Sequence, residues 1–338
     1  MDKQRLVQTA QALVAEKKGI LAADESGGTI KRRFDSINVE STEKSRRDYR
    51  EMLFRTAGVS DFISGVILFD ETIRQEAADG TPIVKVLTDQ GIIPGIKVDK
   101  GTISLPSAPY ELVTEGLDSL RDRLTEYVEL GAGFTKWRAV ISITNDTPTS
   151  YGIAANAHAL ARFAALSQEA GLVPIVEPEV LRDGDHSIER CFEVTEDTLR
   201  EVFDQLAQQK VLLDGMLLKP SMVISGGSSS QRADPDEVAE RTIECFKKVL
   251  PAAVPGVVFL SGGEPDNSVT SNLNAINQKT AALGAPWELT FSFGRSLQGA
   301  PLTAWAGKAE NTEAAALAFY TRASLTSAAR QGKYVPEG

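Results

Sequence analysis

The chain has 338 residues, of which 42% are hydrophobic and 24% charged, and its formal net charge is -10. This composition supplies enough apolar residues for a large core, and the acidic balance argues against nucleic acid or an anionic membrane as a main partner. No apolar run approaches the roughly 20 residues of a membrane span, and the polar N-terminus lacks the apolar segment of a signal peptide, so we expect a cytoplasmic protein.

Eight short apolar runs recur along the chain, at residues 19–24, 63–69, 92–98, 134–140, 173–179, 215–219, 256–261 and 288–293. Longer segments separate them. Residues 118–130, 154–170 and 197–209 show helical periodicity, and Asp234-Pro235 opens a further helix. Eight strand–helix units predict an α/β fold, a (β/α)8 TIM barrel, as one domain over residues 1–338. A doubly wound sheet is the alternative, but residues 26–29 lack the spacing of its dinucleotide loop.

Ionisable side chains gather at the C-terminal ends of the predicted strands, where a barrel places its active site. Residues two apart on a strand share a face, as in the pair Lys136 and Arg138 and the pair Glu177 and Glu179. The set comprises Asp24, Lys97, Lys136, Arg138, Glu177, Glu179, Lys219 and Arg295, which is five cations and three anions. Each alone could be a solvated charge at the barrel rim or half of a salt bridge. Together they predict a site with a local charge of +2, suited to a phosphorylated substrate.

Lys219 lies in an apolar stretch, residues 214–223. Burial lowers the pKa of a lysine and exposes a neutral amine that can attack a carbonyl. An isolated lysine of this kind is more often a snorkelling or salt-bridged side chain. Because so many charged groups accompany it, we interpret Lys219 as a Schiff-base nucleophile.

Two groups of loops have the composition of phosphate sites, although each glycine pair could also be an ordinary turn. The first group follows the last two strands, where barrels commonly bind phosphate, and its candidates are Ser261, Gly262, Gly263, Ser292, Gly294 and Arg295. The second runs from Ser26 to Arg33, with Thr29 expected as a helix N-cap and Arg33 on the same helix face. Two anion sites beside one lysine predict a substrate phosphorylated at both ends.

Seven motifs, in order and at matching spacing, resemble those of class I fructose-1,6-bisphosphate aldolases from about Gly19 to Pro336. They are GILAADES at 19–26, GIKVDKG at 95–101, KWR at 136–138, VEPE at 176–179, LLKP at 217–220, FLSGG at 259–263 and FSFGR at 291–295. The resemblance implies a TIM barrel and a metal-independent lyase without a cofactor. The implied reaction is reversible cleavage of D-fructose 1,6-bisphosphate to dihydroxyacetone phosphate and D-glyceraldehyde 3-phosphate in glycolysis and gluconeogenesis.

The resemblance also implies roles for the matching residues. Lys219 would form the Schiff base, Glu177 would be the acid and base of imine formation, and Asp24 would move the proton of the C4 hydroxyl. Lys136 would lie beside Lys219 and favour its neutral amine, and Glu179 would orient and balance these lysines. The remaining assignments concern substrate binding: Ser261, Gly262, Ser292, Gly294 and Arg295 for the C1 phosphate, with Gly263 beside them, and Ser26, Thr29, Arg33, Lys97 and Arg138 for the other phosphate or the sugar.

The chain departs from animal members of the family at its C-terminus. Those members have a long tail that ends in a tyrosine implicated in protonating the enamine, and we expect this tail to be absent here. Tyr334 belongs to the segment before it and should not take its role. The family further implies a homo-oligomer, specifically a homotetramer.

Two other functions stay open at this point. One is a lysine aldolase or transaldolase for another sugar phosphate, such as sedoheptulose 1,7-bisphosphate, and the other is a non-catalytic phosphate-binding barrel. The only two histidines, His158 and His186, exclude a three-histidine zinc site, and no ligand spacing supports a mixed one.

Overall fold

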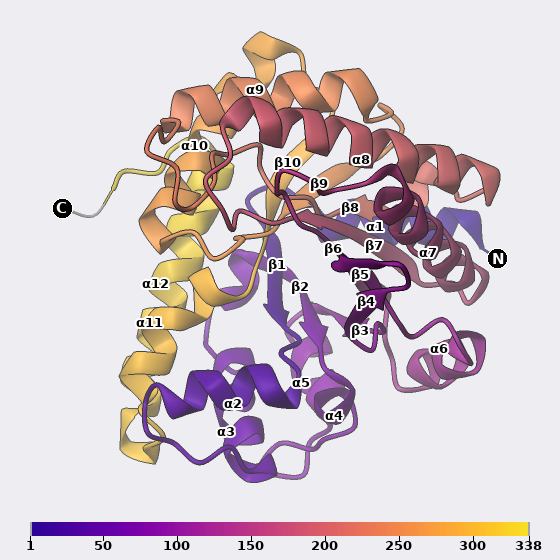
Figure 1. Cartoon of the computed structure of the whole chain (residues 1–338). Helices are drawn as coiled ribbons and strands as arrows, with labels where there is room; N and C mark the ends of the chain where they lie inside the picture. Colours follow the sequence, from indigo (N-terminus) through magenta and orange to yellow (C-terminus); the bar gives the residue numbers. More distant parts are fainter. Residues whose placement is uncertain (1, 337–338) are drawn as a thin grey trace.

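The computed structural model describes residues 2–336 as a closed barrel of parallel strands with helices around it (Figure 1). Around the barrel the strand order is β1, β10, β9, β8, β7, β6, β3, β2. Every predicted apolar run forms one of these strands, so the (β/α)8 prediction is confirmed. Their bounds are β1 Gly19–Ala23, β2 Ile63–Leu68, β3 Ile93–Lys97, β6 Phe134–Ile141, β7 Val173–Val180, β8 Leu217–Leu218, β9 Gly256–Phe259 and β10 Glu288–Phe293.

Helices connect the strands and cover the outside of the barrel (Figure 1). No helix within residues 2–336 is long and apolar enough to cross a membrane. The helices are α1 Lys3–Leu13, α2 Gly27–Asp35, α3 Glu43–Phe54, α4 Asp70–Ile73, α5 Ile83–Thr88, α6 Leu120–Glu129, α7 Ser150–Glu169, α8 Ile188–Gln208, α9 Pro235–Val249, α10 Asp266–Leu283, α11 Arg295–Trp305 and α12 Thr312–Arg330, with 3-10 turns Val59–Asp61, Leu213–Gly215 and Ala309–Asn311.

Side-chain caps decide where two of the predicted helices begin. Helix α8 begins at Ile188, earlier than the predicted residue 197, because the Ser187 side chain accepts a hydrogen bond from the Arg190 amide. Helix α9 begins at Pro235 after the N-cap Asp234, as predicted.

Helix α1, which the apolar-run analysis missed, closes the N-terminal end of the barrel. Its buried residues Leu6, Ala10 and Leu13 pack with the barrel interior, which includes Phe134. The interior is full at this level: a Cβ on Gly95 would lie 2.3 Å from the Phe134 ring. The open end of the barrel is therefore the C-terminal one.

After β3 the alternation of strands and helices is interrupted by a β-hairpin. Its strands are β4 Thr102–Leu105 and β5 Ala108–Thr114. Only three of the eleven residues in its two strands are buried, so they lack the apolar run that marked the barrel strands. The buried Glu111 fastens it to α7, since its carboxylate accepts hydrogen bonds from the Thr149 amide (2.8 Å) and hydroxyl (2.6 Å).

Alternation along β6 sends successive side chains to opposite faces of the barrel wall. Lys136 and Arg138 point to the site at the mouth of the barrel. Trp137, between them, is buried against helix α7, with its ring stacked on Phe163 at a centroid distance of 5.6 Å. The predicted shared face of Lys136 and Arg138 is therefore confirmed.

Candidate active site

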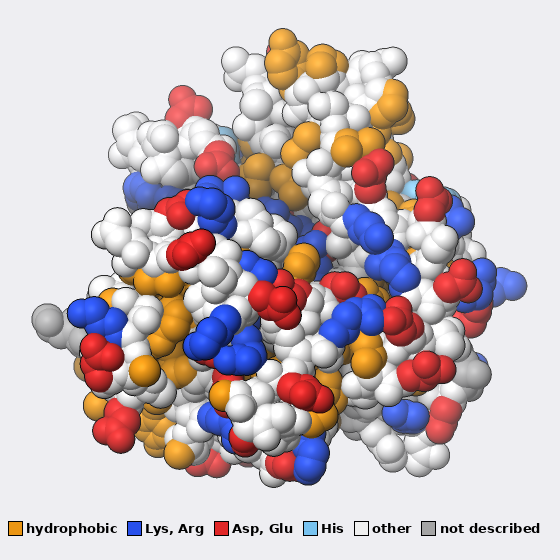
Figure 2. Space-filling view, turned by 90° about the horizontal axis from the view of Figure 1, so that it is seen from below, with side chains coloured by type: hydrophobic (Ala, Val, Ile, Leu, Met, Phe, Trp, Pro, Cys, Tyr) orange, Lys and Arg blue, Asp and Glu red, His pale blue; other side chains and the backbone are white. Residues whose placement is uncertain are grey.

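Two connected lobes form a hollow at the C-terminal mouth of the barrel. The larger has a volume of about 720 Å³ and the smaller about 500 Å³. Asp24, Arg33, Lys136, Arg138 and Gly294 line both lobes, so these residues lie between the two. The face viewed in Figure 2 shows acidic and basic side chains intermixed, with basic side chains around a central recess.

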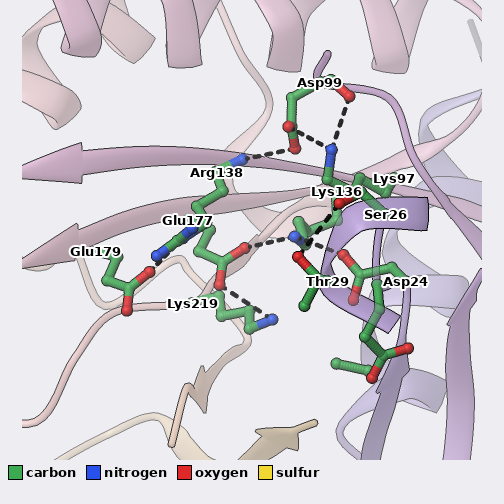
Figure 3. Close-up of polar contacts among 12 residues, drawn as sticks. Asp24, Ser26, Thr29, Lys97, Asp99, Lys136, Arg138, Glu177, Glu179 and Lys219 are labelled. Carbon is green, nitrogen blue, oxygen red and sulfur yellow. Dashed lines mark hydrogen bonds and ion pairs between the residues drawn. The ribbon is translucent and has the colours of Figure 1, made fainter. Parts of the chain in front are cut away.

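A buried chain of ion pairs crosses the centre of the hollow (Figure 3). Lys219 Nζ, just after β8, lies 3.1 Å from Glu177 Oε1 on β7. Glu177 Oε2 lies 3.0 Å from Lys136 Nζ on β6, which lies 2.7 Å from Asp24 Oδ2 after β1. Four residues on or just after four strands therefore meet in one cluster, as predicted, although Lys136 is the third residue of β6 and not near its C-terminal end.

The cluster is almost closed to solvent, and its charges control one another. Lys219 and Lys136 are each 3% exposed. Burial opposes ionisation of Glu177, but the ammonium groups of Lys136 and Lys219 outweigh it and hold the pKa of Glu177 below its ordinary value. The pKa of Asp24 is lowered in the same way against burial. Burial would lower the pKa of Lys136, but Asp24 and Glu177 raise it.

Glu177 lies between the two lysines, and this changes the expected effect of Lys136 on the charge of Lys219. Each ammonium group contacts a different oxygen of this carboxylate. The repulsion between Lys136 and Lys219, which was expected to favour a neutral amine, is therefore offset by a shared counter-ion. Glu177 is also the nearest group that can take a proton from Lys219.

Glu179 does not have the expected lysine partners. Its carboxylate forms an ion pair with Arg138. The expectation that Glu179 orients the lysines is therefore wrong for this structure. In the β6–β7 register Glu179 lies opposite Val140, beyond Glu177, which lies opposite Arg138, and the long Arg138 side chain reaches it there. Glu179 orients an arginine of the hollow instead.

The smaller lobe contains Lys219 and the first predicted phosphate group. Gly262 and Gly263 adopt positive φ values of 56° and 77°, a backbone form that glycine permits. Helix α11 begins at Arg295, so its N-terminus faces the lobe. The buried Ser292 Oγ has no hydrogen-bond partner within the described chain, which leaves it free for a ligand. The lobe brings together all six predicted residues, namely Ser261, Gly262, Gly263, Ser292, Gly294 and Arg295.

The larger lobe contains the second predicted group, namely Ser26, Thr29, Arg33, Lys97 and Arg138. Helix α2 begins here at Gly27, and its N-cap is Ser26. The prediction of Thr29 as N-cap is wrong, since Thr29 lies inside the first turn and its hydroxyl is 3.2 Å from that of Ser26. Arg33, one turn further on, lines the lobe as predicted.

Two acidic residues that the sequence analysis missed hold the cations of the larger lobe. Glu25 accepts hydrogen bonds from Arg33 Nη1 (2.5 Å) and Gln298 Nε2 (2.7 Å). Asp99 accepts one from Lys97 Nζ (2.5 Å). Each lies one or two residues from a predicted site residue, and this proximity was the signal that could have revealed them. Arg182, three residues after Glu179, was also missed and lines the smaller lobe.

Tyr334 is buried against helix α10, away from the hollow. Its amide donates to Asn274 Oδ1 at 2.9 Å and its hydroxyl lies 3.5 Å from Asn267 Oδ1. It lines neither lobe. Within residues 2–336, no three or more His, Cys, Asp or Glu side chains are grouped to hold a metal ion.

Comparison with known proteins gives one consistent result. A family model described as class-I fructose-bisphosphate aldolase matches residues 5–338. A probable fructose-bisphosphate aldolase class 1 of Xanthomonas campestris pv. campestris is 54% identical over 336 residues, which cover 99% of each chain. Cytosolic fructose-bisphosphate aldolase 4 of Arabidopsis thaliana is 50% identical over 97% of this chain and 83% of its own. A solved structure of fructose-bisphosphate aldolase from Plasmodium falciparum, in complex with TRAP and a small-molecule inhibitor, superimposes with a TM-score of 0.96 at 47% identity, covering 99% of this chain and 96% of that one.

Proposed function

The chain belongs to the class-I fructose-bisphosphate aldolase family, and we propose that Lys219 is the residue that forms its Schiff base. The protein is a lyase that cleaves D-fructose 1,6-bisphosphate reversibly to dihydroxyacetone phosphate and D-glyceraldehyde 3-phosphate. One observation supports Lys219 above other lysines: its amine is buried at the end of β8, in contact with a carboxylate that a second lysine also binds.

In the proposed mechanism the Lys219 nitrogen attacks the C2 carbonyl of the ketose, and Glu177 transfers the protons as water leaves and the iminium forms. The C3–C4 bond then breaks, and its electron pair moves into the iminium to give an enamine. Asp24, held ionised, accepts the proton of the C4 hydroxyl as that carbon becomes the aldehyde of glyceraldehyde 3-phosphate. Protonation of the enamine at C3 and hydrolysis release dihydroxyacetone phosphate and restore Lys219.

The two lobes suggest how the substrate lies. The C1 phosphate would occupy the smaller lobe, where the Gly262–Gly263 turn and the N-terminus of α11 surround the space beside Lys219. The second phosphate would occupy the larger lobe, near Arg33 and Lys97. The reacting carbons would then lie over the shared residues Asp24 and Lys136.

Borohydride trapping tests the nucleophile. Reduction in the presence of dihydroxyacetone phosphate should inactivate the enzyme and place one adduct on Lys219, as peptide mass spectrometry can show. The Lys219→Met variant should give no adduct, whereas Lys136→Met should still be labelled on Lys219, more slowly. An adduct on another lysine, or activity lost in EDTA and restored by zinc, would contradict the assignment.

The family relation favours fructose 1,6-bisphosphate over the alternative substrates and over a non-catalytic barrel. Relative turnover of fructose 1-phosphate and sedoheptulose 1,7-bisphosphate would measure how strict this preference is. A cytoplasmic location is also part of the proposal, and the name of the cytosolic Arabidopsis relative supports it.

Assembly into a homotetramer is a further part of the proposal. Family membership supports it, and so do exposed apolar side chains, namely Tyr110 and Ile103 on the hairpin and Tyr151 at the start of α7. Light scattering on the purified protein would give the number of subunits.

A further inference from the structure

Arg182 lies just beyond β7 and binds the glycine turn of the smaller lobe from one side. Its Nη1 donates to the Gly263 carbonyl at 3.0 Å. A Cβ on Gly263 would lie 3.0 Å from Arg295 Nη1, so a second guanidinium group is close to the same glycine. The turn that follows β9 therefore lies between two arginines, of which the sequence analysis identified one and Arg182 is the one hydrogen-bonded to it.

Glu264 fixes the Arg182 side chain. Its Oε1 lies 2.8 Å from Arg182 Nε, and the Glu264 side chain is only 5% exposed. Arg232 contacts the same carboxylate at 3.1 and 3.2 Å. A buried carboxylate between two guanidinium groups keeps both close to it, because moving either away would leave the buried charge unpaired.

Arg182 also joins the turn to the serine-rich segment 225–230. The Gly227 amide donates to the Arg182 carbonyl at 2.7 Å, and the Ser228 amide to the Gly184 carbonyl at 2.9 Å. A Cβ on Gly227 would lie 3.0 Å from Arg182 Nη2, so this glycine lets the segment approach the guanidinium group. Gly227 and Ser228 line the smaller lobe together with Arg182.

The planar guanidinium group of Arg182 therefore makes two contacts in different directions, which a single lysine ammonium group at this position could not make together. One goes to the backbone of the turn and the other to Glu264. A glycine pair at positive φ has many accessible conformations, and its amides bind an anion well only if the turn is held in one of them. Anchoring the Gly263 carbonyl removes that freedom.

We propose that Arg182 is a positioning residue that holds the Ser261–Gly263 turn in its phosphate-binding conformation and so sets the affinity for the ketose phosphate beside Lys219. This inference rests on the proposed placement of the C1 phosphate in the smaller lobe. It concerns binding, and Arg182 takes no part in proton transfer.

The experiment compares Arg182→Ala, Arg182→Lys and Glu264→Gln with wild type in borohydride trapping over a range of dihydroxyacetone phosphate concentrations. The concentration of dihydroxyacetone phosphate that gives half-maximal labelling should rise about tenfold in Arg182→Ala, the usual effect of losing a charge-assisted hydrogen bond. Arg182→Lys keeps the charge without the planar guanidinium group. This variant and Glu264→Gln should each show a smaller rise in the half-saturating concentration. Inhibition by glyceraldehyde 3-phosphate should not change, and kcat should fall less than KM for fructose 1,6-bisphosphate rises.

Arg190→Ala is the matched control, since Arg190 is a surface arginine paired with Glu193 at the start of α8. Arg295→Ala tests the lobe itself. If Arg295→Ala raises half-saturation and Arg182→Ala does not, the inference is overturned and the proposed function stands. If neither does, while Lys219 is still labelled, the phosphate placement fails as well. Wild-type affinity for dihydroxyacetone phosphate in Arg182→Lys would show that the positive charge alone is sufficient. If Arg182→Ala lost affinity equally for dihydroxyacetone phosphate and glyceraldehyde 3-phosphate, the defect would be a general structural one. Either result overturns the inference.

Discussion

At the scale of single residues, Glu177 is the group on which both lysines of the site converge. Lys219 must give up a proton before its nitrogen can attack, and Glu177 Oε1 is within reach of that proton. Because the neighbouring cations lower the pKa of Glu177, its protonated form is a comparatively strong acid. It can therefore return the proton to the hydroxyl that leaves as the iminium forms, which suits one group to both directions of transfer.

Asp24 should make the stability of the fold depend on pH in the acid range. Its pKa is lowered in the folded protein from an ordinary value of 3.8, so its carboxylate stabilises the fold above that pH. That contribution is lost as the pH falls below 3.8 towards the folded pKa. Asp24→Asn should therefore cost about 3 kcal/mol of unfolding free energy at pH 7, in line with breaking a buried ion pair. The difference from wild type should shrink progressively at lower pH, as urea unfolding would show.

Asp35→Asn is the control for this prediction, because the Lys31–Asp35 pair is exposed on α2. Exposed pairs contribute little, so its difference from wild type should stay small throughout. A difference for Asp24→Asn that does not change between pH 7 and pH 3 would contradict the assignment of the lowered pKa.

The sequence predicts which residues reach the site better than it predicts their partners. Positions such as Lys136 and Glu177 follow from two-residue alternation and from the common direction of the strands. Whether Glu179 contacts a lysine or Arg138 depends on the register of β7 against β6 and on side-chain length, which no local pattern encodes.

At the scale of elements, two helix N-termini face the two lobes. Helix α2 begins at Gly27 beside the larger lobe, and α11 begins at Arg295 beside the smaller one. Free amide groups and the helix dipole make each terminus favourable for an anion. The ends of β1 and β10 thus lead into both proposed phosphate sites through the helices that follow them.

Ser292 should contribute to ligand binding and little to folding. Its buried hydroxyl at the end of β10 has no partner in the described chain, so Ser292→Ala breaks no internal hydrogen bond. We expect half-saturation by dihydroxyacetone phosphate to rise by a factor of about two to ten, the value of one hydrogen bond. The unfolding free energy should change by less than about 0.5 kcal/mol. Borohydride trapping and urea unfolding on one preparation measure both quantities.

Thr290→Val on the same strand is the matched control with the opposite outcome. The Thr290 hydroxyl donates to the Lys18 carbonyl at 2.7 Å, away from the lobes. Its loss should cost about 1–3 kcal/mol of stability and leave half-saturation unchanged. A Ser292→Ala variant that is as unstable as Thr290→Val and binds normally would assign Ser292 a structural role.

Two of the elements that escaped sequence analysis lie outside the alternation of strand and helix. The hairpin β4–β5 buries few of its residues and has no apolar run to mark it. Helix α1 did carry a signal, since Leu6, Ala10 and Leu13 follow helical spacing, but its polar residues were interpreted only as the lack of a signal-peptide segment. Its burial comes from the barrel opening that it covers.

At the scale of the whole molecule, packing at one end of the barrel is separated from chemistry at the other. The interior cluster fills the N-terminal half with side chains of α1 and the strands. The ion-paired cluster occupies the C-terminal half. Inward positions along β6 show the change, from Phe134 to Lys136 to Arg138. Substitutions in the N-terminal half of the barrel should therefore affect stability without affecting substrate binding.

Leu13→Ala tests this separation. Leu13 is fully buried, and its Cδ2 lies 2.7 Å from where a Cβ on Gly65 of β2 would be, so the leucine fills the space over that glycine. Truncation should leave a cavity and cost about 2–5 kcal/mol of unfolding free energy. KM for fructose 1,6-bisphosphate should stay at the wild-type value, because Leu13 lines neither lobe.

The exposed Gln8 on the same helix provides the comparison, and Gln8→Ala should change stability by no more than about 0.5 kcal/mol. All three proteins are to be unfolded in urea at one protein concentration, since an oligomer's stability depends on it. A Leu13→Ala variant of normal stability with a raised KM would mean that α1 acts on the site through the strands. Normal KM with lowered stability would instead show that the barrel transmits no strain from its closed end to its mouth.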